Sequence, residues 1–94
     1  QAKELLKQLG GNRFRMMVGA KQMSLDKKNG LTMKIGRNAK SISHVRINLK
    51  NDLYDIDFIR VRKGIPKIAK QLKGIYADQL RSVFEKYTGL YTSL

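Results

Sequence analysis

The chain has 94 residues, and its 20 Lys and Arg against 7 Asp and Glu give a formal charge of +13 at pH 7. This length predicts a single domain over residues 1–94, because two cores in so short a chain would each be marginal. With no Cys and a single histidine, His44, the sequence excludes a disulfide framework, a zinc ribbon and thiol catalysis, and the excess charge points to a polyanionic partner, nucleic acid first.

The first two expected elements are a short helix and a strand. Three leucines in AKELLKQL share one helical face and the pair Gly10-Gly11 follows them, which predicts an amphipathic helix over residues 2–9. The next run, RFRMMVGA, alternates apolar and polar side chains with the period of a half-buried strand. We therefore expect the first strand over residues 13–19.

A β-hairpin is expected next. Asn29-Gly30 suits the two positive-φ positions of a type I′ turn, and it would join strands over residues 22–26 and 31–36. The run GRNAKSIS that follows is small, polar and basic, which is typical of a connecting loop.

The cleanest alternation is HVRINLK, which predicts a strand over residues 44–50. A turn at Asn51-Asp52 leads into a second strand over residues 53–62. In this strand the apolar phase slips at Phe58-Ile59. A β-bulge at that point would keep both sets of apolar residues inside.

The basic run RVRKGIPKIAKQLK (residues 60–73) is ambiguous. Its apolar residues have helical spacing, but alternate residues also fit a strand that returns through a turn at Lys63-Gly64, and Pro66 is allowed in either structure. We favour an edge strand over residues 66–73, because Lys and Pro on an edge strand oppose edge-to-edge pairing.

The last element is a helix over residues 76–88. Apolar residues recur at i, i+3, i+4 and i+7 from Leu80, and Gly89 supplies a C-cap. This order of elements predicts an α+β fold: a single small domain with a four- to five-stranded antiparallel sheet and N- and C-terminal helices packed on one face.

Strand alternation also predicts a single basic sheet face opposite the helices. Asp55 and Asp57 share this face and are expected to pair with Arg46 or Lys50 across strands. Lysines and arginines on neighbouring strands repel one another, and phosphate groups would remove that penalty, so phosphate contact rather than base stacking is expected. On that face lie Arg13, Arg15, Lys34, His44, Arg46 and Lys50. The candidate contacts to nucleic acid are Arg13, Arg15, Lys34, Arg37, Lys40, Arg46, Arg60, Arg62, Lys63, Lys67, Lys70 and Lys73.

A catalytic alternative rests on the D-x-D pair Asp55 and Asp57, which could hold Mg²⁺ at a phosphodiester in a nuclease. No His or Lys is specifically placed as a base, and the glycines form neither a P-loop nor a dinucleotide motif. We therefore expect a non-enzymatic protein with no catalytic residue, metal or cofactor.

Three blocks of the sequence resemble a family of small proteins encoded by phages and other mobile elements. They are the opening LGGNRFRMMVGAKQM, matching an LGGN-[K/R]-F-x-x-M-x-GAK start, the central INLKNDLYDIDF, and the ending YADQLRSVFEKYTGLYTSL with its GLYTSL-type terminus. Most members have no assigned activity, so the resemblance implies a genomic setting and carries over no catalytic residues.

That setting implies two functions in the cytoplasm of a bacterial host. One is accessory nucleic-acid binding, to DNA or RNA, in replication, packaging or transfer. The other is counter-defence, in which an anti-CRISPR-like inhibitor binds a host nucleoprotein such as a CRISPR effector. Many such inhibitors are acidic mimics of DNA, whereas a basic one would engage the guide RNA, the bound DNA or an acidic patch.

Two further expectations concern assembly and membranes. No apolar run approaches the roughly 20 residues of a membrane span, so no membrane partner is expected. The predicted edge strand and the partly apolar tail Leu90–Leu94 are compatible with a homodimer.

Overall fold

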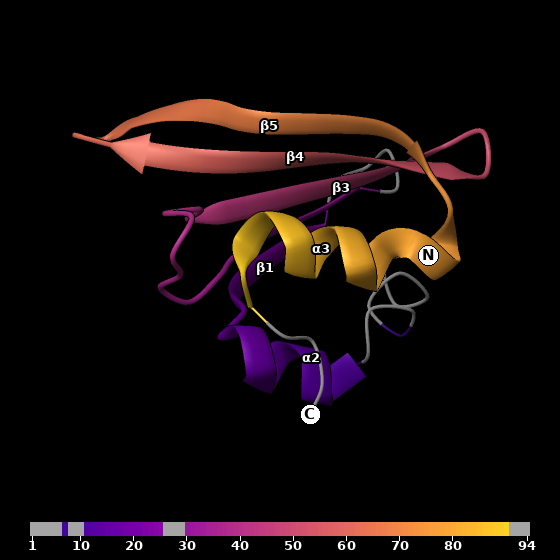
Figure 1. Ribbon diagram of the computed structural model, residues 1–94, viewed down its shortest axis with the longest axis horizontal. Coiled ribbons are helices and arrows are strands. Elements are labelled where there is room, and N and C mark those ends of the chain that lie inside the picture. The colour runs from indigo at the N-terminus through magenta and orange to yellow at the C-terminus, as the bar shows by residue number, and fades with distance from the viewer. Residues whose placement is uncertain (1–6, 8–10, 26–29, 91–94) are drawn as a thin grey trace.

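Figure 1 shows the computed structural model, in which the helices α2 (Gly11–Val18) and α3 (Leu80–Thr88) lie on one side of a twisted sheet. The structure describes Lys7, residues 11–25 and residues 30–90; of residues 12–15 and 25 it describes the backbone only. The helix expected over residues 2–9 lies outside the described residues, except that Lys7 is helical. The elements are α2 (Gly11–Val18), β1 (Lys21–Leu25), β2 (Gly30–Lys34), β3 (His44–Lys50), β4 (Leu53–Arg62), β5 (Ile65–Ile75), the 3₁₀ turn η1 (Ala77–Gln79) and α3 (Leu80–Thr88).

The five strands form one antiparallel sheet in the order β1-β2-β3-β4-β5. Each strand therefore lies beside its neighbour in sequence, as short hairpin connections require. Two of these connections have the backbone of a type I′ turn, with positive φ at both central residues: Asn51 (54°) and Asp52 (65°), and Lys63 (53°) and Gly64 (77°). The two-residue turn expected at Asn29-Gly30 is wrong, because Gly30 belongs to β2 and Leu31 pairs with Leu25, which leaves five residues between the paired positions. The strands on either side do pair, as expected for a hairpin, and residues 26–29 lie outside the described residues.

The strand predicted over residues 13–19 is wrong, because Gly11–Val18 is the helix α2. The apolar spacing of this run also fits a helix, since Phe14, Met17 and Val18 stand at i, i+3 and i+4. Val18 is buried, whereas Met16, which the strand reading placed inside, is 83% exposed. The helix can stop and turn onto the sheet because Gly19 has a φ of +63°.

A close backbone contact fixes the end of α2. The backbone N of Gly36, just after β2, donates to the carbonyl oxygen of Val18 at 2.7 Å. A Cβ on Gly19 would lie 3.2 Å from the Cα of Gly36, so the two glycines allow an approach that other residues would obstruct.

The edge strand favoured over residues 66–73 is confirmed, since these residues belong to β5 (Ile65–Ile75), which forms an edge of the sheet. The register of β4 and β5 shifts between Phe58 and Ile59, where a bulge is expected. The extra residue, however, is Ala69 in β5. Because β4 itself keeps its alternation, Ile59 and Val61 stay on the face opposite Phe58. Val61 accordingly stays 38% exposed.

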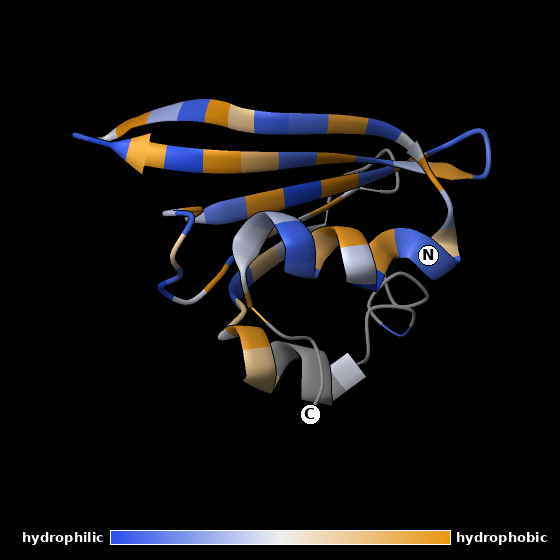
Figure 2. Cartoon of the chain, viewed as in Figure 1, coloured by the Kyte–Doolittle hydropathy of each residue, from blue (hydrophilic) through white to orange (hydrophobic). Residues whose placement is uncertain are grey.

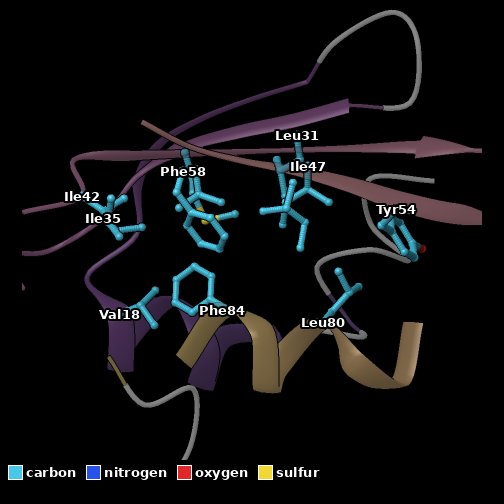
Figure 3. Close-up of a cluster of buried hydrophobic side chains, with 12 residues drawn as sticks. Val18, Leu31, Ile35, Ile42, Ile47, Tyr54, Phe58, Leu80 and Phe84 are labelled. Atoms are coloured by element: carbon cyan, nitrogen blue, oxygen red, sulfur yellow. The ribbon is translucent and has the colours of Figure 1, made fainter. Parts of the chain in front are cut away.

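The core lies between the sheet and the helices (Figure 3). Phe84 projects from α3 toward Phe58 of β4, and Val18 of α2 closes one end. The ring of Tyr87 packs against Phe58 with centroids 5.5 Å apart. The buried apolar residues are Val18, Leu31, Met33, Ile35, Ile42, Val45, Ile47, Tyr54, Ile56, Phe58, Leu80 and Phe84. The five-stranded antiparallel sheet with a C-terminal helix confirms the coarse α+β prediction.

Candidate nucleic-acid interface

The hairpin of β4 and β5 extends beyond the rest of the sheet. The pairing of β3 with β4 ends at His44 and Ile59, whereas β4 and β5 continue through Arg60–Lys67, Val61–Pro66 and Arg62–Ile65. Three residue pairs add about 10 Å at the usual rise of a strand. We call residues 60–68 the overhang; its end projects past β3 and α3 at the left of Figure 1.

The two faces of the overhang differ in chemistry. Alternate residues of β4 point to the same side, so Arg60 and Arg62 continue the face on which Ile56 and Phe58 meet α3. No described helix covers that face beyond Phe58. The outer face carries Val61 and Pro66 instead, and the bands of opposite hydropathy alternate along β4 and β5 in Figure 2.

A concave surface of about 450 Å³ lies on the overhang, and we call it the basic hollow. It combines four cationic side chains with apolar ones, of which Ile65 is 60% and Ile68 52% exposed. The lining residues are Arg60, Arg62, Lys63, Ile65, Lys67, Ile68 and Ala69.

Arg60 is held at the base of the hollow by a backbone acceptor rather than by a carboxylate. Its Nη2 donates to the carbonyl oxygen of Lys40 at 2.9 Å, and its buried Nε has no acceptor among the described residues. Asn38 fixes the loop that supplies this carbonyl, because its side chain donates to Ile42 O at 2.7 Å and accepts from Ile42 N at 3.0 Å. The positive charge of Arg60 is thus positioned, and no carboxylate among the described residues forms an ion pair with it.

The nearest carboxylates in sequence are used in the middle of the sheet. Asp57 is 6% exposed, forms an ion pair with Arg46 at 3.0 Å, and accepts from Gln71 Nε2 at 2.8 Å. Asp55 accepts from the backbone N of Gly74 at 3.1 Å. The cross-strand pairing predicted for Arg46 is confirmed, and residues 58–77 contain six Lys and Arg with no Asp or Glu.

These contacts also describe the D-x-D pair. Each of its carboxylates is committed to neighbouring strands, and among the described residues no group of three His, Cys, Asp or Glu side chains is arranged to hold a metal ion.

The single basic sheet face expected from alternation is not formed. Arg46 is neutralised by Asp57, and the outer face also carries the apolar Ile59 and Val61. Arg13 and Arg15 belong to α2 and therefore leave the sheet altogether.

The candidate cations separate into groups. Four line the hollow: Arg60, Arg62, Lys63 and Lys67. Lys70 lies beside the hollow, with its Nζ 5.7 Å from the centroid of the Tyr87 ring, and Lys40 approaches through its carbonyl. Lys34 lies on the outer face, Arg37 in the loop after β2, and Lys73 beside the bulge at Gly74, all exposed.

The edge of β5 bears on the homodimer expectation, which stays a prediction. This edge carries Pro66, Lys67, Lys70 and Lys73 and has register shifts at two places. These features oppose pairing with the same strand of a second copy, since lysines would meet lysines. Most of the tail Leu90–Leu94 lies outside the described residues.

Comparisons of the chain with protein-family models, curated proteins and solved structures found no match. None of the described helices is long and apolar enough to cross a membrane.

Proposed function

We propose that this protein is a non-enzymatic nucleic-acid-binding protein and that the basic hollow contacts the phosphate backbone. The observation that carries the proposal is the concentration of Arg60, Arg62, Lys63 and Lys67 on one concave surface. Arg and Lys are the side chains that most often contact phosphates.

The absence of acidic residues from this part of the sequence supports the proposal. Four cations without counter-charges repel one another, which costs stability in the free protein. A bound phosphate backbone removes this cost and releases counterions from the nucleic acid. Asp57 and Asp55 cannot neutralise the hollow while they hold β3, β4 and β5 together.

The phage and mobile-element resemblance supplies a setting for this activity. Within it we propose an accessory role in the host cytoplasm, in which the protein coats or guides nucleic acid without cutting it.

Two measurements test the proposal. Binding of a fluorescent oligonucleotide to the purified protein should weaken steeply as salt rises. A pulldown from bacterial lysate should retain nucleic acid, and its protein partners should be released by nuclease. Absence of oligonucleotide binding at low salt, or binding that salt does not affect, would show that the cations do not serve this purpose.

A second candidate is an inhibitor that binds a host nucleoprotein such as a CRISPR effector. The favouring observation is the outer face of the overhang, where Val61 and Pro66 are exposed beside the half-buried Ile59. Phosphates gain nothing from apolar surface, whereas a protein would cover it. A host protein that stays bound after nuclease treatment and is lost in the Val61→Ser variant would support this function.

A further inference from the structure

The basic hollow contains more apolar surface than phosphate binding needs. Ile65 stands opposite Arg62 on the same face of the hairpin, and it is 60% exposed. Ala69, at the bulge, adds to this apolar lining, whereas Ile68 borders the hollow from the outer face, where it pairs with Ile59. Apolar side chains between cations suit a ligand that is itself part apolar and part anionic.

A nucleotide whose base is unpaired has this character. Its phosphate is anionic, and both flat faces of its base are available for contact with aromatic or apolar side chains. In a duplex, by contrast, the bases are stacked between their neighbours, and the phosphates are what a shallow hollow on the protein surface can reach.

We infer that the hollow binds an unpaired nucleotide, with its base against Ile65 and the adjoining phosphates of the strand on Arg62, Lys63 and Lys67, so that the protein prefers single-stranded nucleic acid to duplex. This inference rests on the proposed function. The size of the hollow agrees with it, since about 450 Å³ lies within the range of pockets that hold small organic molecules.

The backbone of the overhang supports a preformed site. Lys63 and Gly64 form a tight turn, and Arg60 is anchored to the carbonyl of Lys40, so both ends of the hollow are fixed before a ligand arrives. A preformed site loses less conformational entropy on binding than one that must order its side chains.

The test uses the full chain and an oligothymidylate of about 12 nucleotides, compared with a duplex of the same length at the same salt concentration. The Ile65→Ala variant should bind the single strand about fivefold more weakly, the effect expected when half of an isoleucine side chain loses its cover, and should bind the duplex unchanged. Val61→Ala, on the opposite face of the same hairpin, is the matched control and should bind both as the parent does.

A second variant supplies a spectroscopic signal. Because the chain contains no Trp, Ile65→Trp introduces a single indole at an exposed position. Its fluorescence should be quenched by oligothymidylate through stacking and should change little with the duplex.

The outcomes distinguish failure of this inference from failure of the proposed function. Equal affinity for single strand and duplex, or an Ile65→Ala variant that binds oligothymidylate like the parent, overturns the inference and leaves phosphate binding intact. If neither nucleic acid binds even at low salt, the proposed function fails together with it.

Discussion

Removing two cations from the basic hollow tests whether position or net charge governs binding. The variant Arg62→Gln with Lys67→Gln lowers the formal charge from +13 to +11, since each substitution removes one positive charge. The matched variant Lys34→Gln with Lys50→Gln lowers it equally, but these exposed side chains lie on β2 and at the end of β3, outside the hollow.

The expected magnitudes follow from counterion release. If the four cations of the hollow each neutralise one phosphate of a single strand, the slope of log K against log salt is about −3, and removing two of them halves it. Each lost contact weakens binding about fivefold at 0.1 M salt, so the double variant should bind about 25-fold more weakly. The matched variant should keep the parental slope.

Fluorescence anisotropy of a labelled oligothymidylate between about 50 and 200 mM salt measures both quantities. Thermal melts establish that the variants fold, which is expected because exposed substitutions usually change stability by less than about 0.5 kcal/mol. Equal losses in the two double variants would refute the reasoning, because binding would then follow net charge and not the hollow.

Three further predictions concern stability and the turn. Asp57→Asn should lower the free energy of unfolding by about 1–3 kcal/mol, because a buried acceptor of several hydrogen bonds is lost, whereas Asp52→Asn, at an exposed turn position with positive φ, should not; urea denaturation compares them. Gly19→Ala should lower the free energy of unfolding more than Gly64→Ala does, since both glycines have positive φ but only at Gly19 would a Cβ meet backbone atoms. Equal losses would mean that the close contact with Gly36 is unimportant for stability. Lys63→Asn should raise the free energy of unfolding by up to about 1 kcal/mol, seen as a higher melting temperature, because Asn accepts the left-handed conformation, and it should weaken oligothymidylate binding about fivefold because a cation of the hollow is lost. If stability and binding both rose or both fell, the role of Lys63 in the turn would not be separable from its charge.

A strand was predictable where its period is unambiguous. HVRINLK alternates over seven residues, and β3 occupies His44–Lys50. The run RFRMMVGA is shorter and fits both a strand and a helix, and what decides for the helix is a close contact with Gly36, far along the chain. Local periodicity carries no information about such a contact.

The candidate site was only partly predictable. Alternation identified which residues face outward, but it treated the sheet as one continuous surface. The overhang was nevertheless implied by the turn at Asn51-Asp52: this turn pairs Lys50 with Leu53, so His44 pairs with Ile59 and β4 continues alone with β5. The carbonyl of Lys40 that anchors Arg60 has no signal in sequence, because a backbone acceptor is available at every residue.

The overhang lies outside the hydrophobic core, and this has a consequence for how such proteins diverge. None of the side chains from Val61 to Ile68 belongs to the buried cluster. Exposed positions of this kind tolerate replacement with little loss of folding stability. The residues at the tip of the hairpin can therefore be substituted while the core and the fold stay the same. Two chains that share every core residue can then differ completely in the ligand that they bind.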